Sequence, residues 1–313
     1  MAKPTVLMIG PYPDGDMAKM EAEYEVLRLW EQPDKAAFLK DSGARVKAIA
    51  TRGDLGAKRD LIDQLPHLEI IGCFGVGTDG IDLDAARGRG VRVANTPDVL
   101  TEDVADIALA LMLAIARQIP AGEQLVRSGR WANENPPLVT RMHGKRLGIV
   151  GLGRIGRAIA QRAEGFGMHI AYHGRTLRTD STYTFCANLN DLARESDFLV
   201  VAVTGGASTA GLISAEVLRA LGPDGFFVNV ARGSVVDEAA LLNALEQRLI
   251  KGAALDVYLN EPNIDARFLT LDNVVLQPHH GSGTVETRKA MGQLVRDNLA
   301  AHFKGLPLLT PVA

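Results

Sequence analysis

The chain has 313 residues, of which 47% are hydrophobic and 23% charged, and its formal net charge is −3. This length corresponds to about two domains, and this composition excludes a chain that is disordered throughout. The slight acidic excess argues against a nucleic-acid-binding protein, which needs a basic face.

Membrane and disulfide signals are both weak. The longest clean apolar run, Ile107–Ala116, is far shorter than the roughly 20 residues that cross a bilayer, and the N-terminal run Val6–Gly10 is too short for a secretory signal. Cys73 and Cys186 lie far apart without metal-ligand spacing. We therefore expect reduced core thiols, no metal site, no membrane partner and a cytoplasmic protein.

Short apolar runs alternate with helical patterns along the whole chain. The predicted strands are, in order, Thr5–Ile9, Val46–Thr51, Leu68–Phe74, Val91–Ala94, Arg146–Val150, His169–His173, Phe198–Val203, Phe226–Ala231, Gly252–Val257 and Asn273–Leu276. The predicted helices include Ala18–Trp30, Ala57–Gln64, Asp103–Ala116, Ile155–Phe166, Ser214–Leu221, Asp237–Gln247 and Val285–Phe303. This alternation is typical of an α/β fold with doubly wound parallel sheets.

One sheet is expected before residue 100 and another from about residue 146. Between them lies the apolar helix Asp103–Ala116, which offers a face for dimer contact, followed by a polar segment containing Trp131. We expect Trp131 to pack rather than to close a pocket. The last helix, Val285–Phe303, is placed to fold back onto the first sheet.

A phosphate-binding loop follows the strand Arg146–Val150. The sequence Gly151-Leu152-Gly153-Arg154-Ile155-Gly156 opens an Ala- and Ile-rich helix, the context in which this glycine pattern binds a dinucleotide. The helix N-terminus presents free N–H groups to the pyrophosphate. A second such pattern, Gly75–Gly80, leads into acidic residues and no long helix, so we expect it to offer N–H groups to a small carboxylate instead.

The residues after the next strand indicate which dinucleotide binds. An NAD site carries an acidic residue about 20 positions after the first glycine, yet none occurs between Gly165 and Thr179. Gly174-Arg175-Thr176 stands there, and a guanidinium pairs well with a 2′-phosphate. The sequence therefore favours NADPH over NADH.

Three polar residues follow the later strands and suit a 2-keto acid. Arg232 can grip a carboxylate, His279 can exchange a proton near neutral pH, and a buried Glu261 beside it would hold the imidazole ring. Ligands bind at the carboxyl ends of such strands, so these residues form a candidate catalytic triad.

Five further segments, together with the glycine loop, make the chain resemble the D-isomer-specific 2-hydroxyacid dehydrogenases over essentially its whole length. They are Phe74–Asp82, Asn95–Asp106, Asn229–Glu238 with Gly252–Pro262, and Gln277–Thr284. The glyoxylate/hydroxypyruvate and hydroxyphenylpyruvate reductases look most similar. The resemblance implies a Rossmann-type dinucleotide domain, 101–284, and a flavodoxin-like substrate domain made of 1–100 and 285–313, in a homodimer.

The resemblance also implies residue roles. Arg232 would orient the substrate, His279 would be the acid and base, and Glu261 would tune His279, while the Pro-His-x-Gly-Ser spacing disfavours His280. The Val76 and Gly77 backbone would bind the carboxylate. From its place in a turn after a strand of the first sheet, rather than from the resemblance, Arg52 is expected either to contact a polar group of the substrate or to lie in solvent. Asp256, Val230 and Thr101 are expected near the cofactor, and His173 near its adenine or 2′-phosphate.

The predicted activity is reduction of a small 2-keto acid to the D-2-hydroxy acid by hydride transfer from NADPH. Two alternatives stay open: the same chemistry on aromatic keto acids such as hydroxyphenylpyruvate, and a non-catalytic dinucleotide sensor. A formate- or phosphite-type dehydrogenase is disfavoured by the NADP-type loop. The sequence has no zinc-protease or serine-hydrolase motif.

Overall fold

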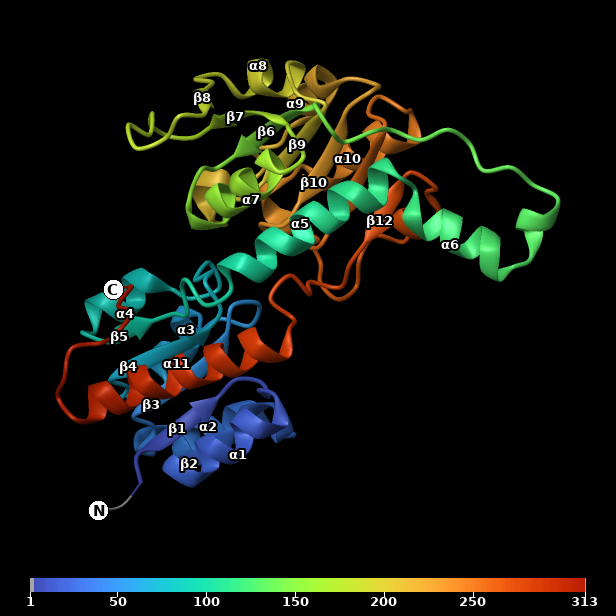
Figure 1. Ribbon diagram of the computed structural model, residues 1–313. Helices are drawn as coiled ribbons and strands as arrows, with labels where there is room; N and C mark the ends of the chain where they lie inside the picture. Colours follow the sequence, from blue (N-terminus) through green and yellow to red (C-terminus); the bar gives the residue numbers. More distant parts are fainter. Residues whose placement is uncertain (1–2, 313) are drawn as a thin grey trace. The chain divides into compact units, whose positions relative to one another are not determined.

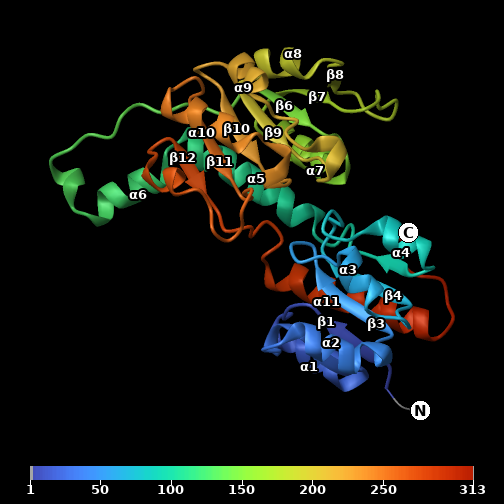
Figure 2. The same cartoon turned by 180° about the vertical axis from the view of Figure 1, so that it is seen from behind.

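The chain divides into two units, each built on one parallel sheet. The computed structural model describes residues 3–312. The first unit runs as far as Leu100 and resumes at Ser282, and the second unit comprises Thr101–Gly281. Figures 1 and 2 show both units from opposite sides. The α/β class with doubly wound parallel sheets is confirmed.

The first unit is a five-stranded parallel sheet in the order β2-β1-β3-β4-β5. This is the flavodoxin-like 2-1-3-4-5 order. Its strands are β1 (Thr5–Met8), β2 (Glu25–Arg28), β3 (Ala48–Arg52), β4 (Ile70–Phe74) and β5 (Arg92–Ala94). Its helices are α1 (Asp14–Glu23), α2 (Lys35–Ser42), α3 (Arg59–Asp63), α4 (Leu83–Gly88) and α11 (Val285–Phe303).

Helices cover both faces of this sheet. On one face α11 lies along β4 with α1 beside it. Gly72 permits this close approach, since a Cβ there would lie 3.1 Å from Cγ1 of Val295. On the other face the core includes Ile49 and Ile71 of the sheet with Leu39, Ile62 and further side chains of α2, α3 and α4. Burial on both faces explains why the inner strands β1, β3 and β4 are mostly apolar.

The second unit is a seven-stranded parallel sheet in the order β12-β11-β10-β9-β6-β7-β8. Its strands are β6 (Arg146–Val150), β7 (His169–His173), β8 (Thr184–Phe185), β9 (Phe198–Val201), β10 (Phe226–Asn229), β11 (Gly252–Leu255) and β12 (Val274–Leu276). Its helices are α5 (Thr101–Ala116), α6 (Ile119–Arg127), α7 (Arg154–Glu164), α8 (Leu189–Arg194), α9 (Ala215–Leu221) and α10 (Glu238–Glu246). Counted from β6, the strand order is that of a Rossmann sheet with one added strand. Successive strands are added on one side of β6 up to β8 and then, from β9 onward, on its other side, so the strand order reverses between β6 and β9.

Short 3₁₀ turns complete the two units: η1 (Leu29–Glu31), η2 (Gly43–Arg45), η3 (Arg130–Ala132), η4 (Ala207–Thr209), η5 (Gly233–Val235) and η6 (Ala266–Thr270). In the second unit α5 packs against α7, β10, β11 and β12. The opposite face carries α8, α9 and α10 over a core that includes Leu199, Phe227 and Leu241. The predicted strands and helices of this unit are present, with ends shifted by one or two residues.

The helix predicted over Ala18–Trp30 is wrong in its second half. There the chain forms the edge strand β2, paired in parallel with β1, and the turn η1. The hydroxyl of Thr5 on β1 donates to Glu25 on β2 at 2.7 Å. Pairing with β1 outweighs a helical pattern that is weak in these residues, because strand propensity depends strongly on context.

The helix predicted as a dimer face is covered within its own unit. Eight residues of α5 are buried, including Ala108 and Met112. The exposed large apolar side chains of this region belong instead to the arm, residues 117–140, which projects from the body of the second unit (Figures 1 and 2). They are Ile119, Val126, Trp131, Leu138 and Val139. Trp131 is 60% exposed, so the expectation that it packs within its own chain is wrong.

Two smaller observations concern membrane and thiol chemistry. Within residues 3–312, no single helix is long and apolar enough to cross a bilayer; α5 and α6 would qualify only together, and they are bent by 62° at the break between them. Within the described residues neither cysteine forms a disulfide, as predicted. Cys73 is fully buried, but Cys186 is only partly so, which corrects its assignment to the core.

Candidate active site

Arg232 follows β10 and is held by a side chain of that strand. The buried Asn229 accepts a hydrogen bond from the Ala231 N–H at 3.0 Å and donates one to the Arg232 carbonyl at 2.9 Å. Gly233 lies so close to the Tyr258 carbonyl that a Cβ would be 2.0 Å from the oxygen. The turn thus fixes the backbone of Arg232, and Asn229 has a positioning role that sequence reasoning missed.

His279 and Glu261 are brought together from the ends of neighbouring strands. His279 follows β12, Glu261 follows β11, and Nδ1 of the imidazole lies 2.5 Å from Oε2 of the carboxylate. The other carboxylate oxygen accepts from the Tyr258 N–H at 2.8 Å. Since a carboxylate can only accept, Nδ1 carries the proton and Nε2 is left for a ligand.

This pair is less buried than the sequence analysis expected. Within the structure the side chain of Glu261 is 26% exposed and that of His279 is 35% exposed. The expectation of a buried Glu261 is therefore wrong, because Glu261 lies on a loop beyond the end of the sheet. The ordered 2.5 Å contact still fixes the imidazole ring.

Asp256 anchors the loop that carries His279. Its carbonyl accepts from the His279 N–H at 2.7 Å, and its carboxylate accepts from the N–H groups of His280 and Gly281 at 2.7 and 2.9 Å. His279 has the left-handed φ of 51°, which needs such support. Burial raises the pKa of Asp256, although the hydrogen bonds from the two N–H donors act to lower it. The side chain of His280 is exposed, away from this network.

The glycine loop in the second unit has the geometry of a dinucleotide cradle. Gly151 has a φ of 99°, and a Cβ on Gly156 would lie 2.0 Å from the Gly151 carbonyl oxygen. A Cβ on Gly153, at the start of α7, would meet no protein atom within 4 Å. The loop also touches Ala202 and Val203 after β9, where the strand order reverses. These residues fit a pyrophosphate at the α7 N-terminus.

The loop after β7 presents arginines at the site expected for a 2′-phosphate. Within the described part of the chain, the exposed guanidinium of Arg175 makes no ion pair or hydrogen bond. The loop itself is held in place: the Arg178 N–H donates to the hydroxyl of buried Tyr172 at 2.7 Å, and Arg157 of α7 pairs with Asp180 at 2.6 Å. Arg157 thereby neutralises the nearest carboxylate of this loop.

In the first unit, the second glycine pattern forms a tight loop after β4. The carbonyl of Val76 accepts from Asn95 at 2.8 Å, and the Gly75 N–H donates to Thr96 at 3.0 Å. Among residues 3–312, the N–H groups of Val76 and Gly77 have no hydrogen-bond partner, although Gly77 is buried. Buried N–H groups are nearly always paired, so this loop is suited to bind an anion.

The remaining candidate residues differ in how well their surroundings suit their expected roles. Arg52 ends β3 and forms a fork with Asp54, at 3.0 and 2.5 Å. Thr101 begins α5, and Val230 follows β10 and is buried. Nδ1 of His173 lies 2.9 Å from the Cys186 carbonyl, which holds the ring against its own unit. No group of three or more metal-ligating side chains occurs among the residues that the structure describes.

Known proteins share this architecture and these motifs. Residues 109–281 match the family described as D-isomer specific 2-hydroxyacid dehydrogenase, NAD binding domain. Three relatives are each 46% identical: glyoxylate/hydroxypyruvate reductase A of Arabidopsis thaliana and hydroxyphenylpyruvate reductase of Plectranthus scutellarioides, each over 98% of both chains, and 2-ketogluconate reductase of Gluconobacter oxydans, over 99% of both.

A solved structure agrees over the full chain. The NADPH-dependent glyoxylate/hydroxypyruvate reductase of Sinorhizobium meliloti, in complex with NADP and malonate, is 45% identical, with a TM-score of 0.93 over 100% of this chain and 97% of that one. The identities exceed what fold alone requires, and the family model covers more than half of the chain. The protein therefore belongs to the D-isomer-specific 2-hydroxyacid dehydrogenases and is an oxidoreductase that uses a pyridine nucleotide.

Proposed function

We propose that this protein reduces a small 2-keto acid of the glyoxylate/hydroxypyruvate type to the D-2-hydroxy acid, with NADPH as the preferred cofactor. The observation that carries the proposal is the Glu261–His279 pair at the carboxyl ends of β11 and β12, in the same unit as the Gly151–Gly156 loop. The relatives with reductase names support it.

The proposed cofactor residues all lie in the second unit. Gly151–Gly156 and the α7 N-terminus would hold the pyrophosphate, and Arg175 with Thr176 would hold the 2′-phosphate. When bound, NADPH supplies the hydride. The guanidinium of Arg175, exposed and unpaired among residues 3–312, supports the preference for NADPH, because a buried or paired arginine would be unavailable to the extra phosphate.

The proposed chemistry at the substrate needs two charged groups of this chain. Arg232 binds the carboxylate and orients the keto group. Nε2 of protonated His279 donates a proton to the oxygen on C2 as negative charge develops there. Throughout this step Glu261 accepts a hydrogen bond from Nδ1–H and keeps the ring oriented. In the reverse direction, neutral His279 takes that proton back.

Two further roles stay proposals. In the first unit the N–H groups of Val76 and Gly77 would bind the substrate carboxylate, which suits their unpaired state. The two units would be the substrate and dinucleotide domains. Asp256, expected near the cofactor, has both carboxylate oxygens engaged by backbone N–H groups, so its support of the His279 loop is the role we favour.

We also propose a homodimer through the arm. Five large apolar side chains are exposed on this one projecting segment, and exposed apolar patches mark protein contacts. Sedimentation of the protein and of Trp131→Asp with Leu138→Asp tests this. A dimer that the double variant converts to monomer is expected, and a wild-type monomer would contradict the proposal. A reducing compartment such as the cytoplasm stays a prediction.

Turnover assays test the activity. The loss of reduced-nicotinamide absorbance is measured with glyoxylate, hydroxypyruvate, phenylpyruvate and 4-hydroxyphenylpyruvate, each with NADPH and with NADH. We expect a higher kcat/KM with NADPH and with the two small acids. Preference for the aromatic acids would support the hydroxyphenylpyruvate alternative. Cofactor binding without turnover of any acid would contradict the proposal and favour a sensor.

A further inference from the structure

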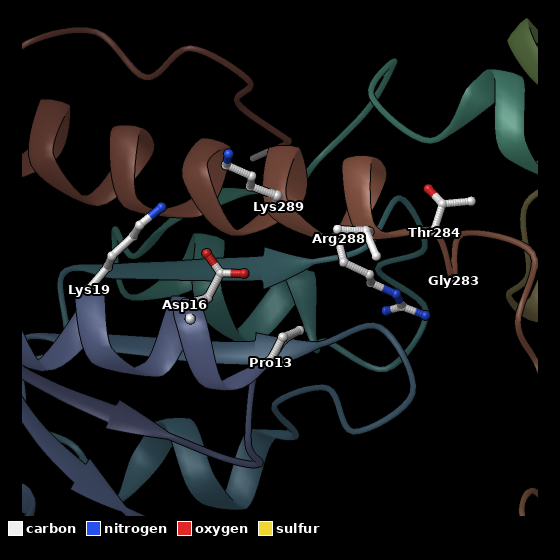
Figure 3. Close-up of a pocket in the computed structure, with 9 residues that line it drawn as sticks. Pro13, Asp16, Lys19, Gly283, Thr284, Arg288 and Lys289 are labelled. Carbon is white, nitrogen blue, oxygen red and sulfur yellow. The ribbon is translucent and has the colours of Figure 1, made fainter.

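The open cavity of the first unit is lined mainly by solvent-exposed residues. Its volume is about 430 Å³, and it lies between the start of α1 and the start of α11 (Figure 3). The lysines in its wall, Lys19 and Lys289, are exposed, and its carboxylate, Asp16, is already paired with the buried Arg296 at 2.7 Å. We assign this cavity no ligand. A buried polar group without an assigned role lies instead in the second unit, next to the candidate catalytic residues.

This group is Tyr258, which contacts three loops of the candidate active site. Its backbone N–H donates to Oε1 of Glu261 at 2.8 Å. Its hydroxyl lies 3.0 Å from the carbonyl of Gln277, two residues before His279. Its own carbonyl packs against Gly233, in the turn that carries the candidate arginine, where a Cβ would lie 2.0 Å from the oxygen. One residue therefore connects the three loops.

The hydroxyl of Tyr258 acts as a donor, because the two groups beside it can only accept. They are the carbonyls of Leu255, at 3.1 Å, and of Gln277, at 3.0 Å. The Leu255 carbonyl also accepts from the Gln277 N–H at 2.8 Å, so it keeps a partner without the hydroxyl. The hydroxyl therefore matters most to the Gln277 carbonyl, and through it to the backbone that leads to His279.

The hydrophobic core fixes the ring of Tyr258. The residue is 7% exposed, and its ring meets that of Phe268 edge-on, with 6.0 Å between the centroids. Leu241 and Leu255 belong to the same core cluster. Burial raises the pKa of the Tyr258 hydroxyl, although the hydrogen bond with Gln277 acts to lower it. The hydroxyl is therefore a protonated donor at a position that packing sets.

We propose that the hydroxyl of Tyr258 is a positioning group for His279, which it holds at hydrogen-bond distance from Glu261 through the Gln277 carbonyl. Pro278 is the one residue between Gln277 and His279, and its ring fixes φ in this link. A displacement of Gln277 is thus transmitted to His279. The backbone N–H of Tyr258 holds Glu261, so one residue acts on both partners of the 2.5 Å contact.

This inference rests on the proposed function, because it assigns Tyr258 to the acid–base pair of that reaction. Proton NMR of the imidazole Nδ1–H tests the positioning without relying on turnover. A short hydrogen bond to a carboxylate moves this proton far downfield, and the signal of His279 is the one that His279→Asn removes. In Tyr258→Phe, which keeps the ring in the core, we expect the signal to move upfield or to disappear through faster exchange with water.

The matched control is Tyr183→Phe, which also removes one hydroxyl hydrogen bond from the second unit. The Tyr183 hydroxyl donates to Glu164 at 2.8 Å, and Tyr183 directly precedes β8, at the opposite edge of the sheet from β12. We expect the Nδ1–H signal of His279 to be unchanged in this variant.

A double-variant cycle tests how the hydroxyl affects the chemistry. With glyoxylate or hydroxypyruvate and NADPH, Tyr258→Phe should lower kcat about 3- to 10-fold, the value of one neutral hydrogen bond. The KM for the keto acid should change about twofold or less. In a Glu261→Gln background, where the contact with His279 is already weakened, Tyr258→Phe should lower kcat about twofold or less. Tyr183→Phe should leave kcat within about twofold in both backgrounds.

Several results would overturn the inference. They are an unmoved Nδ1–H signal in Tyr258→Phe, equal factors in kcat in the two backgrounds, and a fall in kcat matched by an equal loss of NADPH binding, which would mean a general role in the stability of the domain.

Failure of the proposed function is distinguishable from failure of this inference. If the wild type turns over no keto acid but the Nδ1–H signal still moves in Tyr258→Phe, the proposed reaction falls and the positioning of His279 by Tyr258 stands. If the wild type reduces the small acids and Tyr258→Phe changes neither kcat nor the signal, only the positioning inference falls.

Discussion

Glu261 and His279 are joined by a hydrogen bond of 2.5 Å between Oε2 and Nδ1, and the second oxygen of Glu261 is held by the Tyr258 N–H. The two residues are 18 positions apart but follow adjacent parallel strands, β11 and β12. One carboxylate therefore fixes the ring orientation of the proposed acid.

Replacing His279 or Glu261 should lower the turnover rate without weakening NADPH binding. We expect His279→Asn to lower kcat about 10²- to 10⁴-fold, the usual contribution of a positioned acid. Glu261→Gln should lower kcat by a smaller factor, because glutamine keeps a hydrogen-bonding group while removing the charge. Steady-state assays measure both, and fluorescence titration should show NADPH binding within about twofold of the wild type. Normal turnover of His279→Asn would refute its role.

Arg175 should determine the cofactor preference. In Arg175→Ala, loss of a charged hydrogen bond to the 2′-phosphate should raise the KM for NADPH about 10- to 100-fold. The KM for NADH should change about twofold or less. Arg194→Ala is the control, since Arg194 is an exposed arginine paired with Asp191 on α8. Equal effects of Arg175→Ala on the two cofactors would contradict the assignment.

Tyr172 should also affect the preference for NADPH over NADH, because it holds the loop that carries Arg175. Its hydroxyl accepts from the Arg178 N–H, so Tyr172→Phe releases that backbone group while keeping the ring packed against Phe185. We expect the KM for NADPH to rise about 3- to 10-fold, the value of one neutral hydrogen bond. The NADH kinetics and the melting temperature serve as controls. A parallel rise for NADH would show a general loosening of the domain.

The buried pair of Asp16 and Arg296 should dominate the stability of the first unit. The side chains are 6% and 2% exposed, and Gly292 leaves room for them, since a Cβ there would lie 2.3 Å from the carboxylate. Asp16→Ala leaves the buried guanidinium with only the partly exposed carboxylate of Glu23, at 3.8 Å, as a counter-charge, and should lower the free energy of unfolding by about 3–5 kcal/mol.

Urea denaturation measures this change. The double variant Asp16→Ala with Arg296→Met removes both charges and should recover a large part of the loss. Gly292→Ala should destabilise through the same contact. If Asp16→Ala cost less than about 1 kcal/mol, the pair would not hold α11 to α1.

The pH dependence of stability should include a contribution from Asp197. Partial burial would raise its pKa, but hydrogen bonds from the Arg146 side chain and backbone outweigh this and hold the pKa below its ordinary value. A depressed pKa contributes stability above the unfolded value, about 3.9, which is lost as the pH falls through the folded value.

The corresponding variant is Asp197→Asn. It should lower the free energy of unfolding by about 1–2 kcal/mol at pH 7, and the difference from the wild type should shrink as the pH falls below about 4. Asp191→Asn, at an exposed position, is the control and should change stability by less than about 0.5 kcal/mol. A difference that persisted undiminished below the folded pKa would show that packing, not charge, is responsible.

The sequence by itself determined the α/β class, the glycine loop, the missing acidic residue after β7 and the strand ends at which Arg232, Glu261 and His279 lie. These features follow from local patterns: apolar runs buried on two faces, glycines with special backbone angles, and polar residues directly after strands. The family resemblance supplied the order of the motifs.

Only the tertiary structure decided the rest. The edge strand β2 exists because it pairs with β1, and no local pattern marks it. Asp256 supports the His279 loop through hydrogen bonds to residues 24 and 25 positions away in the sequence. Asn229 and Tyr172 hold backbone groups of nearby residues, and such pairings have no sequence signature. The guanidinium of Arg288 lies over the ring of Phe74, about 200 residues away in the sequence, only because α11 packs on β4, and contacts of that range depend on packing of the complete sheet.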